Sequence, residues 1–202
     1  MRNPRFILMG ALLLSLTLSA GASARASGTA ATPATWSPQG LAELQGKPRI
    51  TRRKGGVTAS FFVSATPPQV YQLLTDHEKL PEFMPNLDSC RVRKQGPGWA
   101  EVEMRNARGM MVLRREFDPP RSIRWSLVES SMLKRVEGSW RLEGVEGGTV
   151  LTYDSEVETS VPVPAFVLQF VQRDSLDALV SNVRQRIDSN GTWVKPGFKR
   201  GS

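Results

Sequence analysis

Few residues in this sequence could carry acid–base or nucleophilic chemistry, and their types do not combine into a known catalytic set. His77 is the only histidine and Cys90 the only cysteine among the 202 residues, so multi-histidine metal sites, zinc-binding cysteine pairs and an internal disulfide are excluded. The sequence also lacks a phosphate-binding loop, a nucleophile elbow and a dinucleotide fingerprint. We therefore expect no catalytic residue, no metal and no cofactor. We interpret His77 as a polar residue near a helix start rather than a general base, and Cys90 as a small buried side chain rather than a reactive thiol.

Acidic residues recur at every second position in two segments that we expect to be strands. Glu101 and Glu103 lie in the first, and Asp154, Glu156 and Glu158 in the second. Spacing by two places each set on one side of a sheet. We expect that side to be the outer, solvated one, which disfavours a catalytic carboxylate pair. A register shifted by one residue would reverse this assignment.

Large apolar side chains form a more informative set, because they alternate with polar residues along the same segments. The candidates for contact with a ligand are Met84, Met104, Met111, Trp125, Trp140, Tyr153, Phe166 and Phe170. Methionine adapts to irregular shapes, and tryptophan and tyrosine add one polar group to a large apolar area. Ordinary core packing is the alternative, since pockets and cores use the same residue types. Met110 and Met132 are further flexible side chains that we expect near an entrance.

Three arginines lie close to the hairpin turn expected at Arg108-Gly109. These are Arg105, Arg114 and Arg115, and they could bind the phosphate of a lipid. We interpret them instead as part of a solvated strand face. If the protein were an enzyme, Arg115 or Tyr153 would be the polar group that acts inside the cavity.

The elements that must position these residues follow from hydrophobic periodicity and turn residues. Val57–Val63 is rich in β-branched and aromatic residues and predicts a strand. Two short helices should follow, the first beginning at Pro67 and the second running from Asp76 to Met84. Period-two patterns then predict about six antiparallel strands up to Thr159. Apolar residues at helical spacing across Ala165–Asn190 predict a long amphipathic helix.

A meander of half-buried strands needs cover for one face, and the apolar stripe of the long helix can supply it. We therefore predict an α+β fold in which a curved antiparallel sheet of about six to seven strands wraps around the C-terminal helix. Because sheets twist, a gap with an apolar lining should remain between the sheet and the helix. We expect a secretory signal at 1–26, a flexible lead at 27–48, a ligand-binding domain at 49–190 and a basic tail at 191–202.

One stretch of the sequence resembles a known superfamily. The residues that carry the resemblance are Ala65-Thr66-Pro67-Pro68-Gln69-Val70-Tyr71-Gln72-Leu73-Leu74-Thr75-Asp76, then Leu80-Pro81-Glu82-Phe83-Met84-Pro85-Asn86-Leu87 and Cys90-Arg91-Val92. With the order of elements, they resemble the START-like, helix-grip superfamily (SRPBCC), in its polyketide cyclase/coenzyme Q-binding branch. The resemblance implies a helix-grip fold and a cavity for a hydrophobic ligand, often a lipid, isoprenoid, quinone or polycyclic compound. It does not imply one reaction, because members range from carriers to enzymes.

The N-terminus has the order of a secretory signal. Arg2 and Arg5 precede an apolar run of 13 residues, Phe6–Leu18, and small residues follow up to Ala26. The run is shorter than the ~20 residues of a membrane span, so an uncleaved anchor is the less favoured alternative. We expect a periplasmic or secreted protein. Removing the signal would lower the formal charge from +8 to about +5, which leaves transient contact with a membrane surface open while export disfavours nucleic acid.

These observations favour an exported, monomeric carrier that binds a hydrophobic small molecule or lipid. The alternative is a polyketide cyclase/dehydrase-like enzyme that uses the same cavity, which would need polar groups converging inside it. A third alternative is an interaction module without a ligand, acting through its outer strands. A large apolar cavity would favour the first two.

The signal sequence makes the first testable prediction. Cleavage after Ala24 or Ala26 should give a mature protein that begins at Arg25 or Ser27. N-terminal sequencing of protein recovered from outside the cytoplasm will identify the first residue. An intact Met1 would contradict the predicted export.

Overall fold

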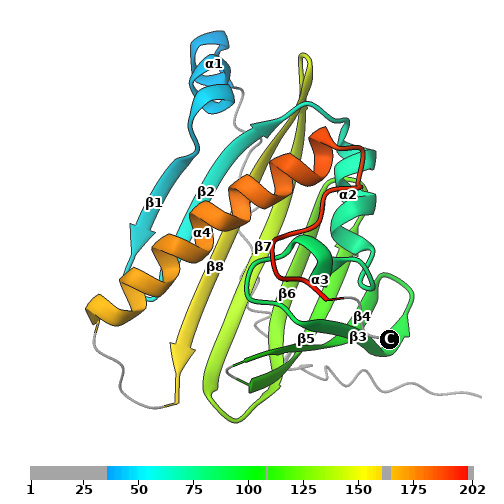
Figure 1. Ribbon diagram of the computed structural model, residues 1–202, viewed down its shortest axis with the longest axis vertical. Helices are drawn as coiled ribbons and strands as arrows, with labels where there is room; N and C mark the ends of the chain where they lie inside the picture. Colours follow the sequence, from blue (N-terminus) through cyan, green and yellow to red (C-terminus); the bar gives the residue numbers. More distant parts are fainter. Residues whose placement is uncertain (1–35, 108, 161–164, 200–202) are drawn as a thin grey trace, which may run out of the picture. The chain divides into compact units, whose positions relative to one another are not determined.

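The computed structural model describes residues 36–107, 109–160 and 165–199, with the side chains of the last helix described from Ser175 onward (Figure 1). The predicted signal and the beginning of the predicted lead lie outside the described residues. Within them, eight strands form one antiparallel sheet in the spatial order β1-β2-β8-β7-β6-β5-β4-β3. The strands are β1 (Arg49–Arg53), β2 (Gly56–Val63), β3 (Ser89–Gly96), β4 (Trp99–Asn106), β5 (Gly109–Asp118), β6 (Ser122–Ser130), β7 (Leu133–Val145) and β8 (Gly148–Thr159). The helices are α1 (Pro38–Gly46), α2 (Pro67–Thr75), α3 (Leu80–Phe83) and α4 (Ala165–Asp188).

The predicted α+β, helix-grip arrangement is confirmed. The curved sheet presents one face to α4, which crosses it obliquely, and α2 and α3 lie toward one end (Figure 1). The sheet has one strand more than the expected maximum, because the short β1 pairs with β2 along five residues. Part of the segment expected to be a flexible lead is also ordered, since α1 forms over Pro38–Gly46 and buries Leu44.

The two short helices follow from local sequence, but the second is shorter than predicted. α2 begins at Pro67, and the side chain of Gln69 accepts a hydrogen bond from the N–H of Thr66 at 2.9 Å. Asp76 does not start the second helix. It ends α2 instead, its N–H donating to the carbonyl of Gln72, and α3 occupies only Leu80–Phe83 before the chain extends at Met84.

The apolar stripe of α4 covers the concave side of the sheet. Its buried residues recur at helical spacing and are Leu176, Leu179, Val180 and Val183. They join one core cluster with Phe61 of β2 and the buried side chains of α2 and α3. No described helix is long and apolar enough to cross a membrane.

The outer face of the sheet carries the acidic residues, as predicted. Glu103 pairs with Arg93 and Arg105, and Asp154 and Glu156 both pair with Arg53. The two edges of the sheet are strongly basic and exposed, and their cations are Arg49, Arg52 and Arg53 on β1 and Arg91, Arg93 and Lys94 on β3. A register shift after Val92 further interrupts the ladder of β3 with β4.

The first part of the predicted basic tail is held against the fold by hydrogen bonds. Arg186 is buried and forms an ion pair with the buried Glu82 of α3, and its other terminal nitrogen donates to the carbonyl of Trp193. The N–H of Lys195 donates to the carbonyl of Glu82, and its Nζ donates to the carbonyls of Met84 and Leu87. Residues 193–195 are therefore fastened to α3 and to the segment that follows it.

The buried ion pair generates a stability prediction. Glu82→Gln leaves the Arg186 cation buried without its anion, so we expect the free energy of unfolding to fall by about 3 kcal/mol. Urea unfolding followed by tryptophan fluorescence will measure the change. Glu43→Gln is the control, because it removes an exposed pair with Arg49 and should change stability by less than about 1 kcal/mol. Equal, small effects of both substitutions would contradict this account.

Candidate functional site

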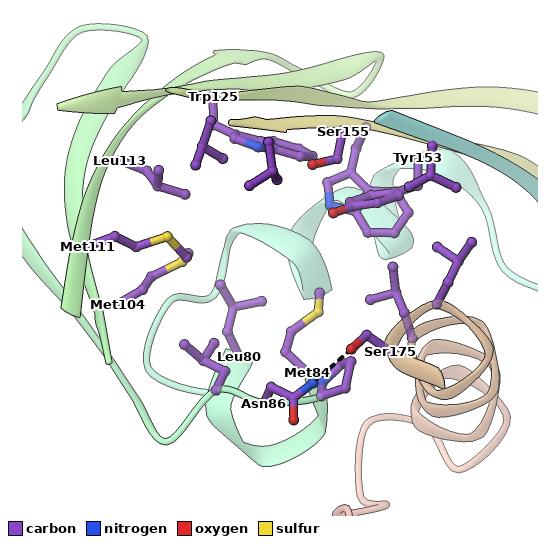
Figure 2. Close-up of a pocket in the computed structure, with 18 of the residues that line it drawn as sticks. Leu80, Met84, Asn86, Met104, Met111, Leu113, Trp125, Tyr153, Ser155 and Ser175 are labelled. Carbon is purple, nitrogen blue, oxygen red and sulfur yellow. Dashed lines mark hydrogen bonds between the residues drawn. The ribbon is translucent and has the colours of Figure 1, made fainter. Parts of the chain in front are cut away.

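A cavity of about 330 Å³ lies between the sheet, the end of α3 and α4 (Figure 2). This volume is at the lower end of the range usual for small-molecule sites. The lining residues come from β2, β4 to β8, the segment from α3 to β3, and the middle of α4. Most are apolar, so the gap expected between a twisted sheet and a helix exists and has the expected lining.

Six of the predicted ligand-contact residues line this cavity. They are Met84, Met104, Met111, Trp125, Trp140 and Tyr153. The other two, Phe166 and Phe170, fall in the first part of α4, whose side chains lie outside the described set. Of the methionines expected near an entrance, Met110 does not line the cavity and Met132 is exposed. Contact of any of these residues with a ligand stays a prediction.

An aromatic wall forms the sheet side of the cavity. Tyr153 stacks on Trp125, with ring centroids 5.7 Å apart, and its ring centroid is 4.8 Å from that of Trp140. Gly138 makes this arrangement possible, because a Cβ at this position would lie 2.3 Å from the Trp125 ring. Trp125 can therefore lie against the backbone of β7 and leave the space in front of it open.

Two methionines form the other end of the lining. Met104 of β4 and Met111 of β5 are directly paired across the sheet, and their side chains run side by side into the cavity (Figure 2). Met84 approaches from the segment after α3. Flexible thioethers on two walls allow the space to adjust to the shape of a ligand.

The environment preferred for Arg115 from the sequence was wrong. Its side chain is not on a solvated strand face, because it is only 4% exposed and lines the cavity. The alternation of β5 explains the position, since Arg115 lies between Leu113 and Phe117 on the same side of the strand. Arg105 and Arg114 lie on the outer face, where they pair with glutamates.

The electrostatics around Arg115 are unusual. One terminal nitrogen donates to the carbonyl of Leu74 at 2.9 Å, while Nη1 is buried without a hydrogen-bond partner among the described residues. Burial lowers the pKa of Arg115 to about 10, so the guanidinium stays charged at neutral pH. It is the only charged side chain among the described residues that line the cavity.

The remaining polar groups of the lining are neutral. Tyr153 and Ser155 project from β8, and burial raises the pKa of Tyr153, so its phenol stays protonated. Asn86 and Ser175 meet at the edge of the cavity, where Asn86 Nδ2 donates a hydrogen bond of 3.0 Å to Ser175 Oγ (Figure 2). This bond links the segment after α3 to α4.

His77 and Cys90 lie outside the lining. Cys90 is buried, as predicted, and burial raises the pKa of its thiol to about 11, which makes it a poor nucleophile. His77 is half-buried, and its ring packs edge-on against Phe117, with centroids 6.0 Å apart. Within the described part of the chain, no three metal-ligating side chains gather closely enough to hold an ion.

Sequence reasoning placed Arg115 inside the cavity only under the enzyme alternative, and it missed the Asn86–Ser175 pair entirely. The signal for Arg115 was present in the alternation of β5, but its charge outweighed its position in the interpretation. No local pattern indicates the Asn86–Ser175 pair, since the two residues are separated by 89 positions.

Comparisons with known proteins found one matching family model and several solved structures with a similar fold. A family model described as polyketide cyclase / dehydrase and lipid transport matches residues 63–184, whereas no curated protein matched the sequence. A fragment of a STAR-related lipid transfer protein from Xanthomonas axonopodis is 14% identical, with a TM-score of 0.59 over 69% of this chain and 91% of that chain.

Two further solved structures are similar. The Zhui aromatase/cyclase from a Streptomyces strain is 18% identical, with a TM-score of 0.57 over 71% of this chain and 99% of that chain. A START superfamily protein from Mycobacterium smegmatis is 18% identical, with a TM-score of 0.57 over 67% of this chain and 98% of that chain. At these identities, the likeness establishes a shared fold.

The half-buried His77 generates a pH prediction. Burial lowers its pKa from 6.5 to about 4, so the unfolded chain takes up the proton first as the pH falls. The stability that depends on a neutral His77 is fully present above about pH 6.5 and is lost as the pH falls toward 4. We expect His77→Gln to lose less stability across this window than the wild type.

The difference should be about 1–2 kcal/mol, after a discount for the partly exposed ring. Urea unfolding of both proteins at several pH values between about 4 and 7 will measure it. The carboxylates titrate in both proteins, so their contribution cancels. Parallel pH profiles would show that His77 is not buried as the structure has it.

Proposed function

The chain belongs to the polyketide cyclase/dehydrase and lipid transport family, and from this premise we propose that it is an exported carrier of one apolar small molecule. The observation that carries the proposal is the cavity of about 330 Å³, with its aromatic wall and its paired methionines. Burial of an apolar ligand there would contribute about 25 cal/mol for each Å² removed from water. Isoprenoid, quinone and polycyclic compounds all have the apolar area that this lining would cover.

The segment Met84–Leu87 is the part of the described lining that we expect to move when a ligand enters, because it belongs to no helix or strand. It lines the cavity and is held from one side by the Asn86–Ser175 hydrogen bond and from the other by Lys195. Breaking one neutral hydrogen bond costs about 1 kcal/mol. The Asn86 side is therefore the easier one to open, while Lys195 keeps the segment anchored to the end of the chain.

An enzyme of the cyclase type is the second candidate, and the polar groups of the cavity are the observation that favours it. A protonated Tyr153 can donate a proton, and a guanidinium such as that of Arg115 can stabilise an oxyanion. One structural neighbour is named an aromatase/cyclase and another a lipid transfer protein. The carrier is the better-supported reading, because no histidine or carboxylate among the described lining residues can act as a general base.

The place of action follows from the sequence. The predicted signal at residues 1–26 supports export to the periplasm or the medium, and a net charge of about +5 on the mature chain supports transient contact with an anionic membrane surface. A monomer that exchanges its ligand at such a surface fits both properties.

The experiment that tests the proposed function is native mass spectrometry of protein purified from the periplasm. We expect a population with the added mass of one small molecule, which organic extraction should release and identify. Unchanged recovery of that molecule supports a carrier, and recovery of a converted product after incubation supports the cyclase. Protein that carries no molecule and binds no apolar fluorescent probe would contradict both.

Removal of the Trp140 ring makes a sharper test. Trp140→Ala should weaken binding of an apolar fluorescent probe by at least tenfold, because the ring forms part of the aromatic wall. The variant will also lose about 3–5 kcal/mol of stability, so binding must be titrated well below its melting temperature. Leu44→Ala is the matched control, since Leu44 is buried between α1 and the sheet and does not line the cavity. A folded Trp140→Ala that binds like the control would count against the carrier.

A further inference from the structure

We propose that the cavity selects amphipathic anions, with a single carboxylate head seated on Arg115 and an apolar tail along the methionines. The inference rests on the proposed function, because it presumes that a small molecule occupies the cavity. It adds the chemical class of that molecule and the direction in which it lies.

The first step is the charge of the cavity. Arg115 brings one positive charge into an otherwise neutral lining, and the acids on nearby elements are engaged elsewhere. Asp76 pairs with Lys79, Asp118 with Arg121, and Glu82 with Arg186. A desolvated cation without an anion is unfavourable, so an anionic ligand would be stabilised there more than a neutral one.

The second step is the unused hydrogen-bonding capacity of Arg115. The guanidinium carries five N–H donors in a planar fork, and the hydrogen bond from Nη2 to the Leu74 carbonyl uses one side of it. The nitrogen Nη1 is buried and has no partner among the described residues. A carboxylate is the group that matches such a fork, because its two oxygens accept parallel N–H bonds.

The third step is the path that the rest of the ligand would take. Leu113 and Met111 precede Arg115 at two-residue spacing on the same face of β5. The apolar wall therefore extends roughly 13 Å along the strand from Arg115 to Met111. Trp125 is directly paired with Arg115 on the neighbouring strand and also lines the cavity. A linear tail that starts at Arg115 would therefore pass Trp125 and end between Met104 and Met111.

A purely structural role is the competing explanation. The Leu74 carbonyl belongs to the last turn of α2, where a cation is favourable, so Arg115 could serve only to hold this helix. Such a role predicts no discrimination between an acid and its ester. It also leaves Nη1 without a hydrogen-bond partner among the described residues, although the guanidinium lies 5.7 Å from the centre of the Phe117 ring.

The experiment compares dodecanoate with methyl dodecanoate, which share a tail and differ in charge. Both are titrated against the full wild-type protein by displacement of an apolar fluorescent probe. We expect dodecanoate to bind at least tenfold more tightly than the ester. Arg115→Met should abolish this preference while keeping binding of the ester, and Arg114→Met, on the outer face of the same strand, should keep the preference.

The outcomes separate the two proposals. Equal binding of acid and ester to the wild type overturns the anion site and leaves the carrier in place, with Arg115 as a support of α2. Failure of the wild type to bind the probe, the acid or the ester overturns the carrier and the anion site together. If Arg115→Met does not fold, the wild-type comparison of acid and ester still decides the question, and Arg115→Lys, which keeps the charge, should retain a preference for the acid.

Discussion

A twisted sheet and a straight helix cannot remain in contact along their whole length, and the rest of this structure depends on that mismatch. On one side, α4 lies close to β2, where Arg184 donates to the backbone carbonyl of Phe62 and Val183 is fully buried. Toward the other side the sheet curves away, and Leu176 and Leu179 line the cavity. The cavity is therefore a consequence of the fold rather than an addition to it, and the side chains only determine its size and polarity.

Two arginines are buried in the described part of the chain, and their partners differ. Arg186 has the carboxylate of Glu82 and a backbone carbonyl as partners, which fastens the residues after α4 to α3. Arg115 has one backbone carbonyl and an unpartnered nitrogen. The first arrangement is typical of a structural ion pair, in which both charges are satisfied. The second leaves a buried hydrogen-bond donor unused on a side chain that lines the cavity, and the anion proposed above would use it.

The sheet and the long helix could be predicted from the sequence, because both follow from hydrophobic periodicity. Six of the lining residues were also predicted. Alternation placed Met104 and Trp140 on the inner face, and the same rule should have placed Arg115 there. The charge of Arg115 favours a solvated position, but the place of a residue in a strand decides the direction of its side chain. The Asn86–Ser175 contact was beyond the sequence, because it joins two residues that are 89 positions apart. Phe166 and Phe170 lie where side chains are not described.

The basic edges of the sheet affect self-association of the protein at high concentration. An open sheet ends in two rows of unpaired backbone groups, and copies of such a protein can join through them into fibres. Here β1 and β3 both carry several guanidinium or ammonium groups, so joining two edges would strip water from cations and crowd charges of the same sign. The register shift after Val92 also bends one of these rows out of line. Both edges of the described sheet therefore disfavour polymerisation through backbone pairing.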